Sequence, residues 1–110
     1  MSLMKDDGER VDLVALHAVF CAIFSSPVRL QIMDLLALGE ESVGGLAEKL
    51  NVSMANISQH LRLMRNQGAL SFRKEGKTVY YRVANPKFVE GIMKVREGLS
   101  EELRKRGGIG

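Results

Sequence analysis

The segment from residue 53 to residue 62 has the polar side chains that proteins use to read DNA bases. The amides of Asn56 and Gln59 can each donate to and accept from adenine in the major groove. Serine hydroxyls, and the free N–H groups at the start of a helix, bind phosphate. We therefore predict a DNA-reading surface from the outward positions of this segment, which are Ser53, Met54, Ala55, Asn56, Ser58, Gln59, His60 and Arg62.

A basic hairpin is predicted directly after this segment. Apolar and polar residues alternate on both sides of Glu75-Gly76, which is typical of two strands joined by a two-residue turn. Lysines and arginines near such a tip can meet the phosphate backbone or enter a minor groove. Arg65 is a further candidate for phosphate, although it can instead turn toward the hairpin. The predicted DNA contacts of the hairpin are Arg73, Lys74, Lys77 and Arg82.

His60 leaves several roles open. Its imidazole can contact a base or a phosphate, and it can also ligate a metal ion. A capping or packing role inside the protein explains the same residue about as well as a base contact does.

His17 and Cys21 are weak candidates for a metal site. They lie four residues apart on the first predicted helix and therefore on one face. Doubled in a dimer, they would supply four ligands. The interpretation that we favour is a small buried Cys21 beside a surface or interface His17, because Cys21 lies within an apolar stripe. Oxidation of the Cys21 thiol is a weaker hypothesis.

The sequence has no pattern typical of a catalytic centre. It contains no Ser/His/Asp order with a nucleophile turn and no glycine-rich phosphate loop. Two histidines and one cysteine leave few groups for acid–base chemistry. We predict that the protein is not an enzyme.

Hydrophobic periodicity and turn residues divide the chain into helices and one hairpin. Ser53 is a suitable N-cap for the helix that contains the reading segment, and Asn85-Pro86 begins the last helix. The predicted elements are helices at 10–24, 27–38, 43–50, 54–67 and 86–105, and a hairpin at 69–83. This order predicts a mainly α (α+β) fold, a winged helix-turn-helix with five helices and a two-stranded β-hairpin wing.

The last helix has an apolar stripe whose spacing resembles a coiled-coil seam. Because a chain of 110 residues buries only a modest core, we expect this stripe to form a dimer interface with the first helix. A helix packed on the core of a monomer is the alternative. The predicted helical dimer interface consists of Leu13, Leu16, Phe20, Phe88, Ile92, Val95 and Leu99.

Length and charge fit one domain that faces a polyanion. We expect a flexible segment at 1–9 and one DNA-binding domain at 10–106. Residues 51–84 hold six basic side chains and one acidic side chain, whereas the first fifty residues hold four basic and eight acidic. No apolar run approaches the ~20 residues that cross a bilayer, so we predict a cytoplasmic protein without a membrane partner.

These segments resemble the ArsR/SmtB family of winged-helix repressors. The resemblance is most specific in Ser-Gln-His-Leu at 58–61 and in Gly-Lys-Thr-Val-Tyr-Tyr-Arg at 76–82. It implies a homodimer that binds a palindromic operator in double-stranded DNA and is released by an inducer, often a metal ion. In this family the histidine that matches His60 lies in the DNA-reading helix, so a metal role for His60 is the poorer hypothesis. The matching runs are 24–29, 46–61, 64–70 and 73–82.

The well-known sensing sites of this family do not carry over to the sequence. One site uses Cys-x-Cys before the reading helix, where this chain has neither thiol nor imidazole at 42–46. The other uses Asp, His and Glu on the last helix, where residues 86–106 contain neither His nor Asp. We therefore predict no cofactor, and the sequence does not identify the inducer, the operator or the regulated genes. A protein-interaction module and an architectural DNA binder without an inducer are the alternatives to an inducible repressor.

Overall fold

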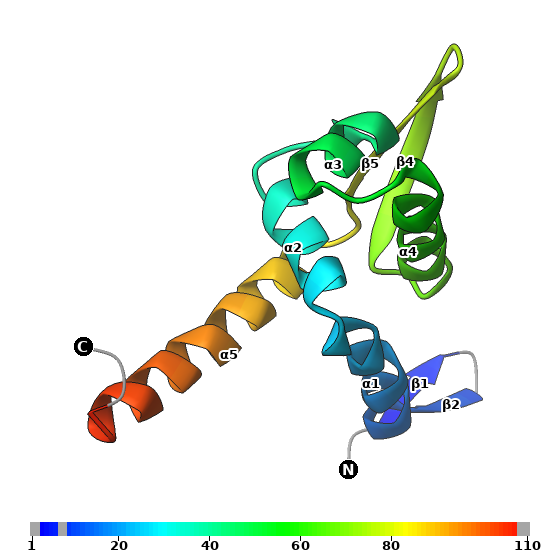
Figure 1. The fold of residues 1–110 in the computed structure, drawn as a ribbon. Coiled ribbons are helices and arrows are strands. Elements are labelled where there is room, and N and C mark those ends of the chain that lie inside the picture. Colours follow the sequence, from blue (N-terminus) through cyan, green and yellow to red (C-terminus); the bar gives the residue numbers. More distant parts are fainter. Residues whose placement is uncertain (1–2, 7–8, 108–110) are drawn as a thin grey trace.

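The computed structural model describes residues 3–6 and 9–107 (Figure 1). Within these residues the predicted five α-helices and the hairpin wing are present, together with a short 3₁₀ helix, η1, and three further short strands. In chain order the elements are β1 (Leu3–Asp6), β2 (Glu9–Asp12), α1 (Leu13–Cys21), η1 (Ala22–Ser25), α2 (Pro27–Leu36), β3 (Glu41–Ser42), α3 (Val43–Leu50), α4 (Met54–Asn66), β4 (Leu70–Glu75), β5 (Thr78–Val83) and α5 (Pro86–Lys105).

Side-chain caps fix the helix-turn-helix formed by α3 and α4. Ser42 Oγ accepts a hydrogen bond from the Gly45 N–H at 3.0 Å and starts α3. Ser53 Oγ accepts from the Asn56 N–H at 3.1 Å and starts α4. Between the two helices Asn51 has a φ of 55°, a left-handed conformation that ends α3. Because these signals are local, the bounds of both helices lie within one residue of the prediction.

The N-terminal residues form strands where the sequence predicts a flexible segment at 1–9. β1 and β2 pair antiparallel, with Leu3 opposite Asp12. The two strands are held by hydrogen bonds between their backbones. The side chains of so short a polar run show no alternating pattern from which these strands could be predicted. Residues 1–2 and 7–8 lie outside the described residues.

The first helix is shorter than the predicted 10–24. The Asp12 carboxylate accepts from two N–H groups of the first turn, at 3.0 and 3.2 Å, so α1 begins at Leu13. The chain then tightens into η1, where Phe24 leaves helical geometry, and Pro27 opens α2 at 95° to the preceding segment. Among the described residues no single helix is long and apolar enough to cross a membrane. The segments Leu13–Ser25 and Pro27–Leu36 reach that length and apolar composition only when they are counted together across their bend.

The predicted two-stranded hairpin is present as β4 and β5, and a third strand extends it to an antiparallel sheet of order β3–β5–β4. β4 and β5 pair from Leu70 opposite Val83 to Glu75 opposite Thr78. β3 adds two residues to the other edge of β5, and a strand of two residues is too short to show alternation in the sequence.

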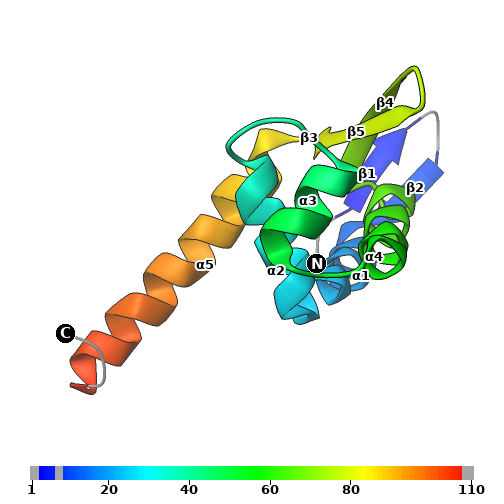
Figure 2. The same cartoon turned by 45° about the horizontal axis from the view of Figure 1, so that its top comes forward.

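The core lies between α2, α3, α4 and one face of the sheet. α1 and α5 contain no buried residue, and α5 extends away from the body in both views (Figures 1 and 2). The fold therefore leaves these two helices without a partner over much of their length. The largest fully buried side chains are Ile32, Met33, Leu46, Ile57, Leu61 and Met64.

Candidate nucleic-acid interface

α4 has one buried apolar face and one exposed polar face. Ile57, Leu61 and Met64, at spacings of four and three, are 0% exposed and hold the helix on the core. Ser58 and His60 are half-buried. The structure therefore brings the predicted reading residues together on one helix surface, while the contacts of each with DNA stay a prediction. The exposed members of the predicted set are Ser53, Met54, Ala55, Asn56, Gln59 and Arg62.

His60 has a partner that the sequence analysis missed. Arg29 Nε, on α2, donates to His60 Nδ1 at 3.1 Å. Burial, and then the charge of Arg29, lower the pKa of the His60 imidazole below its ordinary 6.5. The histidine thus has a packing role inside the chain, one of the roles that its sequence leaves open.

Arg65 turns toward the hairpin. Its guanidinium carbon lies 4.8 Å from the centre of the Phe72 ring on β4, within the range of a cation–π interaction. Of the two predicted roles for Arg65, this contact agrees with packing against the hairpin and not with a free side chain that binds phosphate.

The two faces of the wing carry different charges. Successive side chains of a strand point to opposite faces, so Phe72 and Lys74 share one face of β4 and Arg73 and Glu75 share the other. The first face is the inner one, because the Phe72 ring lies 5.9 Å from that of the buried Tyr81. Lys74 is therefore on the side of α4, whereas Arg73 is on the outer face.

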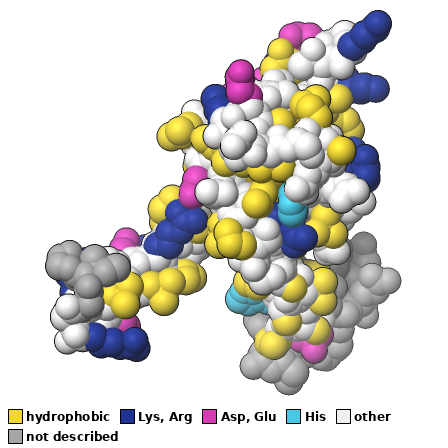
Figure 3. Space-filling model, viewed as in Figure 1, with side chains coloured by type: hydrophobic (Ala, Val, Ile, Leu, Met, Phe, Trp, Pro, Cys, Tyr) yellow, Lys and Arg dark blue, Asp and Glu magenta, His cyan; other side chains and the backbone are white. Residues whose placement is uncertain are grey.

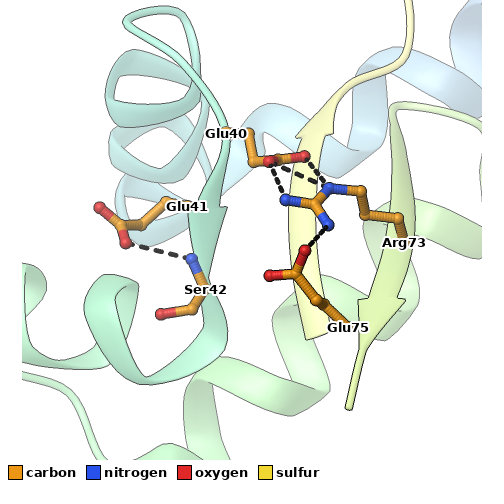
Figure 4. A network of polar contacts seen from close by, with 5 residues as sticks. All are labelled: Glu40, Glu41, Ser42, Arg73 and Glu75. Carbon is orange, nitrogen blue, oxygen red and sulfur yellow. Dashed lines mark hydrogen bonds and ion pairs between the residues drawn. The ribbon is translucent and has the colours of Figure 1, made fainter. Parts of the chain in front are cut away.

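Arg73 is held by carboxylates of its own chain (Figure 4). Its Nε and Nη2 donate to Glu40, at distances from 2.7 to 3.1 Å, and its Nη1 donates to Glu75 at 3.2 Å. The guanidinium also lies 4.6 Å from the centre of the Tyr80 ring. The bond from Arg73, with a smaller effect of the Arg82 charge, keeps the pKa of the Glu40 carboxyl below its ordinary value.

This network changes the interpretation of Arg73. A guanidinium offers carboxylates the same forked geometry that it offers phosphate, so its donors already have partners. Glu40, between α2 and β3, is a residue that the sequence analysis did not connect with the wing. In the described part of the chain, the basic side chains of the reading helix and wing without such an ion pair are Arg62, Arg65, Lys74, Lys77 and Arg82. Of these, Arg65 is already stacked on the Phe72 ring.

An apolar groove of about 610 Å³ runs between α1 and α5. Figure 3 shows hydrophobic side chains along both projecting helices and basic side chains at the tip of the wing. Leu16, Val95 and Leu99 are 53%, 63% and 59% exposed, which is unusual for residues of this size.

The predicted dimer stripe divides into two parts. Phe20, Phe88 and Ile92 pack against the core of their own chain, and the rings of Phe20 and Phe88 lie 4.6 Å apart. Val95 and Leu99, further along α5, stay exposed. The start of α5 therefore packs on the core of its own chain, as the alternative prediction has it. The rest of α5 keeps an exposed apolar stripe, as expected of a dimer interface.

Cys21 is exposed, contrary to the predicted burial. It lines the groove with His17, which is also exposed, because α1 does not pack on the core as an apolar stripe would suggest. The described residues contain no group of three or more His, Cys, Asp or Glu that could hold a metal ion.

Comparisons with known proteins place these features in context. The family model of the bacterial regulatory protein, arsR family, matches residues 26–71. The transcriptional repressor SdpR of Bacillus subtilis is 38% identical over 66 residues, which are 60% of this chain and 72% of the repressor. The transcriptional activator HlyU of Vibrio cholerae is 42% identical over 57 residues, which are 52% of this chain and 53% of the activator.

A solved structure matches nearly the whole chain. It is the homodimeric winged helix-turn-helix DNA-binding domain of Mb0332 from Mycobacterium bovis, described as a possible ArsR-family transcriptional regulator. The TM-score is 0.76 at 28% identity, and the match covers 94% of both chains.

Proposed function

The chain belongs to the ArsR family of bacterial regulatory proteins, and from this premise we propose that it is a homodimeric, sequence-specific DNA-binding repressor of transcription. The observation that carries this proposal is the exposed polar face of α4, which is fixed on the core by three fully buried residues and lies beside a basic wing. A regulator of this kind acts on DNA in the cytoplasm, and we place the protein there.

The reading residues divide by chemistry into base and backbone contacts. We assign base contacts to Asn56 and Gln59, whose amides have the paired donor and acceptor that adenine requires. We assign phosphate contacts to Arg62, Lys74 and Lys77, whose cations have no carboxylate partner in the described part of the chain. Arg82 is not included, because its charge acts on the Glu40 carboxyl of its own chain. The Ser53 hydroxyl oxygen accepts from the backbone of α4, and its O–H remains free to donate to a DNA phosphate.

The unpartnered parts of α1 and α5 support a homodimer. Exposed Leu16, Val95 and Leu99 would become buried against a second copy. A two-fold axis through this seam would present two α4 helices to one side of the duplex, in successive major grooves about 34 Å apart. The matched Mycobacterium bovis domain is homodimeric, which supports the same arrangement for this chain.

Repression would follow from occupancy of promoter DNA. The relatives include a repressor and an activator, and we propose repression because the chain covers more of the repressor than of the activator. Release would require an inducer of unidentified chemistry. The relatives named here are regulators rather than enzymes, which supports a non-catalytic role.

Selection of bound duplexes from a random DNA pool tests the proposal. We expect enrichment of an inverted repeat whose half-site centres lie about one helical turn apart. Three phosphate contacts per protomer give six per dimer, so log K should fall against log salt with a slope of about −5. A protein-interaction module would enrich no sequence, and that result would reject the proposal.

A further inference from the structure

Arg29 occupies a position that helix energetics alone does not favour. It lies in the first turn of α2, where the positive end of the helix dipole repels a cation. Its side chain is also half-buried. Contacts of its guanidinium must therefore compensate for this unfavourable position.

Those contacts join three elements through one side chain. Nε donates to His60 Nδ1 on α4 at 3.1 Å, and Nη1 donates to the backbone carbonyl of Ile23 in η1 at 3.1 Å. Ile23 is itself 3% exposed and anchors η1 in the core. Since η1 connects α1 to α2, the guanidinium links the root of one projecting helix to the reading helix.

The hydrogen bond also fixes the chemical form of His60. A guanidinium has donors only, so Nδ1 must accept, and the neutral ring then carries its proton on Nε2. A protonated imidazole would place an N–H against the N–H of Arg29 and break the contact. Arg29 is the charged group that acts on this ring in the described part of the chain, and its charge adds to the effect of burial in favouring the neutral form.

We propose that Arg29 is a positioning residue, which couples the α1–α2 junction to the DNA-reading helix through His60. This inference rests on the proposed function, because it assigns the contact a role in DNA reading. His60 follows Gln59 and lies one helical turn beyond Asn56, so a shift of the ring moves the part of α4 that carries both amides.

The test compares two arginines of the same chain. Arg29→Met removes the donors and keeps an unbranched side chain, and Arg62→Met makes the same change at an exposed position of α4. We expect Arg29→Met to lower affinity for the selected operator about tenfold without changing the salt slope. Arg62→Met should instead flatten the salt slope by about one unit per protomer.

Variants of His60 complete a double-mutant cycle. His60→Leu should match the loss caused by Arg29→Met, and the double variant should lose no more than either single variant. His60→Asn places an amide oxygen near the position of Nδ1 and should stay within about threefold of wild type. Additive losses, or a flatter salt slope for Arg29→Met, would overturn the inference.

A measurement without DNA separates this inference from the proposed function. Titration of the His60 ring by NMR should give a pKa below 6.5 in the wild type and a higher value in Arg29→Met or, if that variant unfolds, in Arg29→Gln, because both substitutions remove the charge that acts on the ring. An unchanged His60 pKa would reject the coupling even if the wild type selects an operator. If the wild type selects no DNA, the proposed function fails and the positioning role fails with it.

Discussion

At the scale of single residues, the contacts around the reading helix separate side chains that face solvent from those that serve the fold. Asn56 and Gln59 are exposed, and their side-chain amides have no partner among the hydrogen bonds of the described residues. Arg73, by contrast, is bonded to two carboxylates. Side chains of the first kind are free to contact DNA in the proposed complex, and those of the second kind are held by contacts within the chain.

Gln59→Ala tests the first kind of residue. We expect a loss of roughly 1–3 kcal/mol in specific binding and a relaxed preference at one base position, because a bidentate base contact disappears. Competition between the selected operator and single-base variants measures both effects. Unchanged affinity for the operator would show that the reading face has been assigned wrongly.

Glu40→Gln tests the second kind of residue through pH. The folded-state pKa of Glu40 is lowered from 4.5, so its contribution to stability is fully present above pH 4.5 and is lost as the pH falls through the folded value. The urea midpoint of the variant should therefore depend less on pH below 4.5 than that of the wild type. Glu75→Gln, which removes a single 3.2 Å contact, is the control. Identical pH profiles for wild type and Glu40→Gln would contradict the assignment.

At the scale of elements, the wing is a strand pair with two electrostatically different faces. Its tip and inner face carry the cations of Lys77 and Lys74, while its outer face carries the cluster of Arg73 with Glu40 and Glu75. Pairing with β3 and the contact to Glu40 attach this outer face to the α2–β3 connection. We therefore expect the tip to contact DNA and the outer face to hold the wing in place.

Lys74→Ala and Arg73→Gln distinguish these roles. Lys74→Ala should weaken binding to all duplexes alike and flatten the salt dependence by about one unit per protomer. Arg73→Gln should leave the salt slope unchanged, because its charge is already neutralised within the chain. Filter binding or fluorescence anisotropy at several salt concentrations measures the slopes. Equal flattening by both substitutions would return Arg73 to the set of phosphate ligands.

At the scale of the whole molecule, two helices project from a small core. Only the first part of α5 packs against that core, and the ion pair of Arg96 with Asp34, at 2.8 Å, ties its middle to α2. Leu99, beyond this point, is 59% exposed in one chain. A second copy would cover this side chain and would set the distance between the two reading helices.

Leu99→Asp tests the seam between two copies. A carboxylate there would be desolvated twice in a symmetric dimer, so we expect at least about a tenfold rise in the dimer dissociation constant. The fold should persist, because Leu99 is 59% exposed in one chain. Sedimentation at micromolar concentration measures the change. Leu38→Asp, at an 88% exposed leucine on the α2–β3 connection, is the matched control and should remain dimeric. A wild type that sediments only as a monomer would refute the dimer.

The sequence by itself determined the elements whose signals are local. The caps at Ser53 and Asn85 and the buried stripe of α4 predict α4 and α5 to within one residue. The alternation around Gly76 predicts the wing. The exposed face of α4 follows from the same periodicity, because a helix that buries one side must present the other to solvent.

Only the tertiary structure decided which distant groups meet. Arg29 and His60 are 31 residues apart, and Arg73 and Glu40 are 33 apart, so no local spacing joins either pair. The exposure of Cys21 and the pairing of β3 likewise depend on how α1 and β5 are placed. Helix caps and periodicity act over a few residues, whereas these contacts depend on the path of the whole chain through space.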